Sequence, residues 1–228
     1  MSAGSRWGCV EEEPGFLVAP DLILTNAHVA EVLHKQVITG ADVTVRFDYR
    51  TLPNGDLLSP GRVVRLQQDA IVDWSPLDPC DLVQGSSGSP ADENLDYALL
   101  ALAEAVGNEP VGAQPQLGAN ARGWLKASPG VAPAVESPLF ILQHPGGAPL
   151  QLAWGGRVLA VNANGTRVRH DVDTDRGSSG SPVFDCSLSL VAVHHAGSAA
   201  AVPPYNQAIP VGRIVSLLHS RGHTSAFA

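Results

Sequence analysis

The sequence contains few cysteines and no long apolar run. Its three cysteines, Cys9, Cys80 and Cys186, lie far apart and lack the spacing of metal ligands, so they predict neither a disulfide framework nor a metal site. No apolar run approaches the ~20 residues of a membrane span, and residues 1–8 lack the basic and apolar regions of a signal peptide. We therefore expect a protein of the reducing cytoplasm that has no membrane partner.

Basic residues are also scarce. The chain has 14 Lys and Arg against 22 Asp and Glu, a formal net charge of −8 at pH 7, and no basic run. Nucleic acid and anionic membrane surfaces are bound through clustered Lys and Arg side chains. The charge pattern therefore predicts no nucleic-acid partner.

Glycine and proline are plentiful and evenly spread. The 23 glycines and 18 prolines divide the 228 residues into short segments, while 44% apolar content is enough for a real core. Short segments between turn residues are typical of all-β proteins. Long helices are not expected.

The predicted strands fall into two sets. The first set is expected at residues 15–19, 22–26, 42–49, 62–66 and 96–102, with a further strand open at 71–74, a helical stretch at 30–34 and a loop at 75–94. The second set is expected at residues 123–127, 139–143, 150–154, 157–161, 166–172, 182–184 and 190–194, followed by a helix at 209–220. Residues 106–120 lack an apolar period and predict a linker between a unit at 1–105 and a unit at 121–228.

A serine lies in the glycine-rich segment 173–184. Ser179 is surrounded by small residues and followed at once by an apolar strand, which can expose its hydroxyl on a tight turn as a nucleophile requires. The same six residues, Gly-Ser-Ser-Gly-Ser-Pro, also occur at 85–90, where the equivalent residue is Ser87. The local sequence leaves open which copy is functional, and whether either is more than a flexible loop.

Two residues of the first set could serve a nucleophile. His28 follows a predicted strand and precedes a short helical stretch, so its ring can be held rigidly at a cleft as a general base. Asp96 stands at the mouth of a very apolar strand, where a partly buried carboxylate needs a partner such as a histidine N–H. A structural histidine and a solvent-exposed strand cap are the alternatives.

These motifs, Thr-Asn-Ala-His-Val at 25–29, Asp-Tyr-Ala-Leu-Leu at 96–100 and Gly-Ser-Ser-Gly-Ser-Pro-Val-Phe at 177–184, resemble the trypsin-like serine peptidases. The resemblance implies an all-β, chymotrypsin-like fold of two packed six-stranded antiparallel barrels with a C-terminal helix. It also implies a His28, Asp96 and Ser179 triad, an oxyanion hole made by the N–H groups of Gly177 and Ser179, a polypeptide substrate and no cofactor. The Gly-x-Ser-x-Gly elbow of α/β-hydrolases fails because Ser181 occupies its fifth position.

The family pattern also separates the two serines. Its acid precedes its serine, and an apolar strand follows directly after the serine motif. Ser179 meets both conditions, whereas Ser87 precedes Asp96 and is followed by polar residues. The activation route of digestive enzymes is not supported, because the chain has Ser178 where they have an aspartate before the serine.

Specificity remains open between two pockets. Thr174 and His194 stand where glutamyl endopeptidases, which this stretch resembles most, bind an acidic substrate side chain, and Arg176 would favour the same charge. We also expect His195 near the substrate, unless it lies exposed at the strand end. Asp173 stands where trypsins bind Lys or Arg. With a pKa near 6.5, His194 would strengthen acidic preference as the pH falls.

The sequence leaves two questions open. The rival hypothesis to an active peptidase is a peptidase fold that has lost catalysis and acts as a binding module. The sequence also leaves open whether a regulatory domain or partner protein exists outside this chain.

Overall fold

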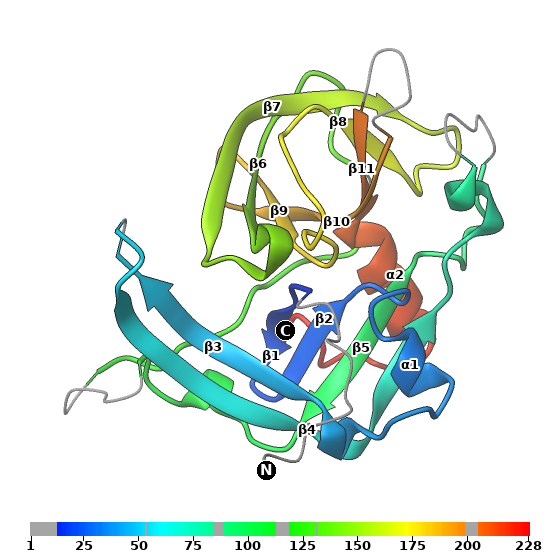
Figure 1. Ribbon diagram of the computed structural model, residues 1–228. Helices are drawn as coiled ribbons and strands as arrows, with labels where there is room; N and C mark the ends of the chain where they lie inside the picture. Colours follow the sequence, from blue (N-terminus) through cyan, green and yellow to red (C-terminus); the bar gives the residue numbers. More distant parts are fainter. Residues whose placement is uncertain (1–12, 53, 84–88, 113–118, 131, 199–204) are drawn as a thin grey trace, which may run out of the picture.

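A computed structural model describes residues 13–52, 54–83, 89–112, 119–130, 132–198 and 205–228. The first half forms an open sheet and the second half a closed barrel, which lie one above the other in Figure 1. Neither helix of the described residues is long and apolar enough to cross a membrane.

The N-terminal sheet has five antiparallel strands in the order β1-β2-β5-β4-β3. Their bounds are β1 Phe16–Ala19, β2 Leu22–Thr25, β3 Thr44–Thr51, β4 Leu57–Ser75 and β5 Tyr97–Leu102, with the short helix α1 Glu31–His34 after β2. Strand β5 is the centre of this sheet and every one of its residues is buried. Its apolar sequence, Tyr-Ala-Leu-Leu-Ala-Leu, accounts for that position, because such a run cannot face water on either side.

The C-terminal strands close into a six-stranded barrel in the order β10-β11-β8-β7-β6-β9. Their bounds are β6 Pro138–Gln143, β7 Gln151–Val161, β8 Val168–His170, β9 Pro182–Asp185, β10 Leu190–Ser198 and β11 Tyr205–Pro210, and the helix α2 Val211–Ser220 follows directly. The connections of the described residues contain four short 3-10 helices, at Gly40–Asp42, Pro79–Leu82, Val106–Asn108 and Pro145–Gly147.

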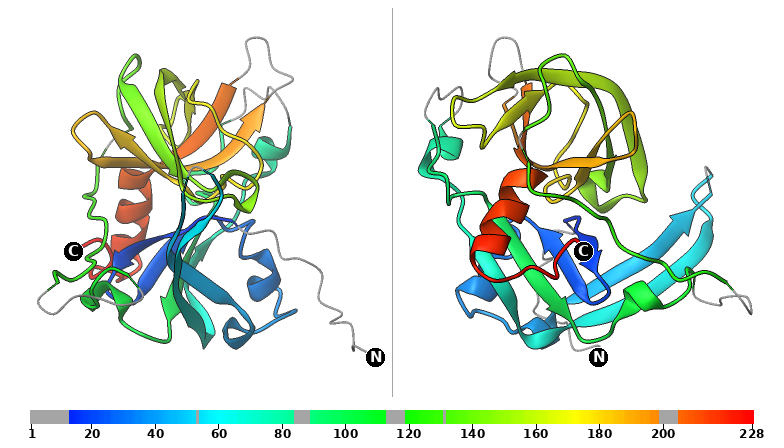
Figure 2. Two further views of the ribbon diagram at one scale, coloured as in Figure 1. Left: turned by 60° about the vertical axis from the view of Figure 1, so that its left-hand side comes forward. Right: turned by 180° about the vertical axis from the view of Figure 1, so that it is seen from behind.

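Three apolar cores hold these parts together. One lies within the N-terminal sheet, one fills the barrel, and the third joins the two halves with α2. The right-hand view of Figure 2 shows this helix (red) between the barrel and the sheet. The third core unites Leu24 and Leu99 of the sheet with Val193 of the barrel and Ile214 of α2. A buried apolar core of this kind fixes the two halves relative to each other, so residues at their interface keep a defined geometry.

The structure confirms the all-β, chymotrypsin-like architecture with its C-terminal helix. It differs from the expected pair of six-stranded barrels in the first half, where the described residues form five strands and the sheet stays open. The long hairpin of β3 and β4 extends away from the rest of the molecule in Figure 1. The edge strands β1 and β3 therefore do not meet.

Two pairs of predicted strands are continuous in the structure. Residues 62–66 and 71–74 both belong to β4, and residues 150–154 and 157–161 both belong to β7. Glycine at 155 has φ of +93° and lies beside an irregularity in the pairing of β6 with β7. Such a bulge bends a strand without ending it, so the two glycines of β7 do not separate residues 150–154 and 157–161 into two strands.

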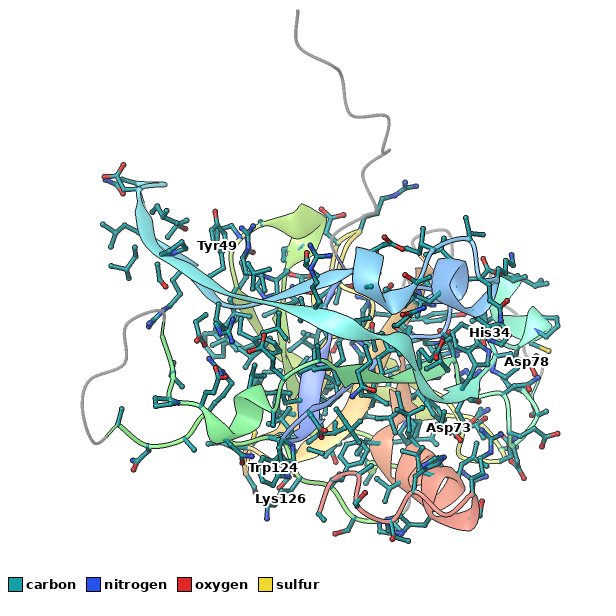
Figure 3. The ribbon with its side chains drawn as sticks, turned by 90° about the horizontal axis from the view of Figure 1, so that it is seen from below. His34, Tyr49, Asp73, Asp78, Trp124 and Lys126 are labelled. Carbon is teal, nitrogen blue, oxygen red and sulfur yellow. The ribbon has the colours of Figure 1, made fainter. Side chains whose placement is uncertain are left out.

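Residues 123–127, predicted as a strand, belong to no strand in the structure. They form a connector that follows β1, where the Leu125 N–H donates to the Leu17 carbonyl at 2.9 Å. The Trp124 ring N–H donates to the Ala228 carbonyl at 2.8 Å, and Figure 3 shows Trp124 and Lys126 side by side on this connector. The alternation of apolar residues here reflects packing against the sheet rather than pairing within the barrel.

The end of the chain holds another difference. The sequence does not predict strand β11, and this strand includes Ile209, the first residue of the predicted helix. The helix itself begins at Val211 and not at 209. Strand β11 is irregular in sequence, with Asn206 and Gln207 among its residues, so no alternation marks it.

Candidate active site

His28 lies in the turn between β2 and α1 and is bound to Asp96 through two N–H groups. Its ring Nδ1 lies 2.8 Å from Asp96 Oδ2, and its backbone N–H donates to Asp96 Oδ1 at 3.1 Å. The Asn26 side chain donates to the Asp96 carbonyl at 2.9 Å, which joins the end of β2 to the start of β5. The His28 side chain is 34% exposed, so part of its ring faces solvent.

Asp96 is fully buried directly before β5, with φ of 44°. Burial by itself raises the pKa of a carboxyl group, but hydrogen bonds from His195 and His28 outweigh it and hold the pKa of Asp96 at about 2. Burial lowers the pKa of His28, yet the hydrogen bond and charge of Asp96, with smaller effects of Glu13 and Glu31, raise it above the ordinary value. The pair therefore favours a carboxylate that supports an imidazolium.

Ser179 lies on the turn that precedes β9, and its neighbour Gly180 packs against the N-terminal half. Gly180 has φ of +84°, and a Cβ there would lie 2.2 Å from the Pro14 carbonyl oxygen and 2.5 Å from Thr25 Oγ1. Only glycine fits so close an approach. The turn is also bound to β10, because the Gly180 N–H donates to the His194 carbonyl at 2.9 Å. The turn that carries Ser179 is thus fixed against the end of β2, three residues before His28.

Gly177 and Ser179 lie in turns, outside any helix or strand, so their N–H groups take part in no regular hydrogen-bond ladder. Within the described part of the chain, neither of them donates to an intramolecular acceptor, and the Ser179 hydroxyl has no hydrogen-bond partner either. The Gly146 N–H donates to the Arg176 carbonyl at 2.6 Å, which ties the turn to the loop after β6. Unpaired N–H groups beside a partly buried serine hydroxyl are the arrangement that an oxyanion hole needs.

The residue order and this geometry agree with a comparison against known families. The model of the trypsin-like peptidase domain matches residues 14–193. The chain belongs to the trypsin-like peptidase family. A comparison with curated proteins found no match.

Solved structures of trypsin-like peptidases have the same fold. The Rv3671c protease from M. tuberculosis in its inactive form is 14% identical with a TM-score of 0.55, over 93% of this chain and 85% of that one. A Glu endopeptidase is 18% identical with a TM-score of 0.55, over 92% and 84%. An inactivated protease paralogue of the scabies mite is 14% identical with a TM-score of 0.57, over 91% and 86%. At these identities the likeness concerns the fold.

The residues expected at the specificity pocket take different positions. Thr174 is partly buried, whereas Asp173 and Arg176 are exposed. The Asp173 carbonyl accepts from the Gln143 side chain at 3.1 Å, so the backbone here is anchored to β6. His194 on β10 is only 4% exposed, and its Nδ1 is buried without a hydrogen-bond partner among the described residues.

His194 differs from expectation in its protonation. Burial lowers its pKa well below 6.5, and the nearby rings of His170, His195 and His28 add to that effect. The expected gain in positive charge at mildly acid pH is therefore wrong for the free protein, because His194 stays neutral there. As a neutral ring it can still donate one N–H to a carboxylate.

His170 on β8 is a site residue that the sequence did not single out. Its ring meets the ring of His194 edge to face at 5.6 Å between centroids. Both of its nitrogens are buried without a hydrogen-bond partner in the described structure, and burial lowers its pKa to about 4. No sequence signal marks it, because a single histidine in a short strand resembles an ordinary core residue.

The structure places His195 against the Asp96 carboxylate and not at the strand surface. Its side chain is fully buried, and its Nδ1 lies 3.1 Å from Asp96 Oδ2. Its burial excludes the alternative in which it lies exposed at the strand end. Ser87, the rival serine, lies outside the described residues, as does Cys9, while Cys80 and Cys186 are free thiols.

Proposed function

We propose that this chain is a serine endopeptidase that acts through His28, Asp96 and Ser179. The observation that carries the proposal is the buried Asp96 carboxylate, which accepts both N–H groups of His28. Such a pair fixes the ring with Nδ1 protonated, so that Nε2 is left as the base. The serine turn packs against the strand that leads to this histidine.

Catalysis follows from these positions. His28 Nε2 takes the proton of the Ser179 hydroxyl as its oxygen attacks the scissile carbonyl, and Asp96 stabilises the imidazolium. The N–H groups of Gly177 and Ser179 bind the oxyanion, a contribution of about 3 kcal/mol for each such donor in related sites. The imidazolium then protonates the leaving amine, and water attacks the resulting ester of Ser179. Catalytic hydrogen bonds commonly close only when substrate is bound, which fits the unpaired Ser179 hydroxyl.

We further propose that the enzyme prefers an acidic residue before the scissile bond. His194 supports this proposal, since a buried ring with an unpaired nitrogen gains a partner when a carboxylate enters. Thr174 can supply a second donor through its hydroxyl, and the exposed Arg176 adds a favourable charge. Because His194 is neutral over the working range of pH, this preference should change little between neutral and mildly acid buffer.

Labelling with a fluorophosphonate tests the catalytic proposal. The reagent should modify Ser179 in the wild type, fail with Ser179→Ala and react far more slowly with His28→Ala. Ser87→Ala is the matched control, because it removes the serine of the other Gly-Ser-Ser-Gly-Ser-Pro copy. Absence of labelling in the folded wild type would support the rival hypothesis of an inactive binding module. Labelling that is lost in Ser87→Ala would show that Ser87, and not Ser179, is the nucleophile.

A peptide library varied at the residue before the scissile bond tests the specificity. Cleavage after Glu or Asp should fall at least tenfold in His194→Ala, the worth of one hydrogen bond to a charged group, while Asp173→Ala leaves it unchanged. Strong cleavage after Lys or Arg that is lost in Asp173→Ala would instead establish a basic pocket.

A further inference from the structure

Asp96 has a second histidine partner besides His28. The His195 Nδ1 lies 3.1 Å from Asp96 Oδ2, the same oxygen that lies 2.8 Å from His28 Nδ1. The side chains of His195 and Asp96 are both 0% exposed, so water cannot replace either contact. Since the carboxylate can only accept, the ring nitrogen of His195 that faces it carries the proton.

The fold explains how adjacent histidines serve different sites. Strand β10 has an irregular register between His194 and Ala196, and successive side chains of a strand point to opposite faces. His194 therefore meets His170, whereas His195 meets Asp96. The far side of the His195 ring is held as well, because its Nε2 lies 3.3 Å from the side-chain oxygen of Gln207 on β11.

We propose that His195 is a positioning residue of the catalytic site, whose Nδ1–H holds Asp96 Oδ2 and so sets the hydrogen bond between Asp96 and His28. The inference rests on the proposed triad. A carboxylate oxygen has two acceptor positions, and here two ring N–H groups occupy them. His195 thereby keeps the carboxylate from rotating. Its N–H also partly neutralises the negative charge on Oδ2, so the carboxylate stabilises the protonated His28 ring less than it would if His28 were the only ring donor.

The hydrogen bond from His195 to Oδ2 therefore affects the pKa of His28. When the His195 donor is removed, the charge on Oδ2 is no longer partly neutralised and stabilises the protonated His28 ring more strongly, so the pKa of His28 should rise further. The other groups that act on His28 are Glu13, in the segment before β1, and Glu31 on α1, where Glu31 is paired with Lys35. None of these changes when His195 is replaced, so a shift can be assigned to the lost donor.

The experiment compares His195→Leu with His195→Asn. Asparagine places an N–H close to the position of Nδ1, whereas leucine has similar bulk and no donor. The titration of the His28 ring is followed by nitrogen-detected NMR in the full chain, and the rate of fluorophosphonate labelling of Ser179 is measured over the same pH range. His219→Leu on α2, outside the site, controls for the loss of a histidine.

The leucine variant should raise the pKa of His28 by about one unit and slow labelling on the acid side about tenfold. The asparagine variant should stay close to the wild type in both. An unchanged His28 titration in the leucine variant, or equal shifts in both variants, would overturn the proposal and leave His195 a packing residue.

The wild-type protein gives an independent test if the leucine variant does not fold. The NMR spectrum identifies the protonated nitrogen of His195, which must be Nδ1; a proton on Nε2 alone would overturn the proposal. These titrations need no activity. A wild type that is not labelled at Ser179 would therefore refute the proposed function, while the His195 and His28 spectra would still decide this inference.

Discussion

Replacement of Asp96 by asparagine is the most informative single change in this site. The carboxylate accepts three N–H groups, from His195, the His28 ring and the His28 backbone. An amide of the same shape keeps one acceptor and puts an NH₂ group in place of the other oxygen. The substitution therefore changes hydrogen bonding with almost no change in volume.

The backbone N–H of His28 decides which way the amide turns. A backbone N–H is always a donor, so the amide oxygen should stay at the position of Oδ1, where that N–H points. The NH₂ group then occupies the position of Oδ2 and faces the Nδ1 atoms of His28 and His195. To accept from the amide, His28 must move its proton to Nε2, and Nε2 can then no longer take a proton from Ser179.

We expect kcat/KM at neutral pH to fall about 10⁴-fold in Asp96→Asn, as the same exchange does in a well-studied triad. That loss corresponds to about 5 kcal/mol of transition-state stabilisation. The assay is peptide hydrolysis or the rate of fluorophosphonate labelling. NMR of the His28 ring should show the proton on Nε2 in the variant and on Nδ1 in the wild type.

Two results would contradict this expected effect of Asp96→Asn. A folded Asp96→Asn protein that keeps activity within tenfold of the wild type would show that the carboxylate does not hold the His28 tautomer. A loss of activity with the proton still on Nδ1 would show that charge, and not the tautomer, is the contribution of Asp96. Circular dichroism establishes that the variant is folded in either case.

Three further predictions concern stability and the serine turn. Gly180→Ala should abolish labelling of Ser179, because its new Cβ would lie 2.2 Å from a carbonyl oxygen, whereas Gly165→Ala, with open space around it, should keep labelling. Asp81→Leu should lower the free energy of unfolding by about 3–5 kcal/mol, since it leaves the buried Arg167 without its 2.6 Å partner; addition of Arg167→Met should recover most of that loss in urea titrations. The free energy of unfolding should fall as the pH drops from about 4 to 2, because the folded pKa of Asp96 lies at about 2 against an ordinary 3.8; Asp96→Asn should show a smaller pH slope.

The proposed triad could be predicted from the sequence because each of its members lies in a local pattern. Ser179 lies between glycines before an apolar strand, His28 follows a strand, and Asp96 directly precedes β5, whose residues are all buried. Strand alternation and turn residues likewise predicted most strands, since these depend on neighbours along the chain. The Asn-Gly pair at 164–165 is a local turn signal of the same kind, and it lies between β7 and β8.

The environment of each site residue depended on contacts between distant segments. His195 and Asp96 are 99 residues apart in sequence, and only the packing of the barrel against the N-terminal sheet brings them together. The depressed pKa of His194 likewise comes from burial beside His170 of another strand. Burial is a property of the assembled core, which no local pattern reports. The sequence by itself thus determined which residues could carry the chemistry, and the tertiary structure decided which of them share a proton acceptor and which are kept neutral.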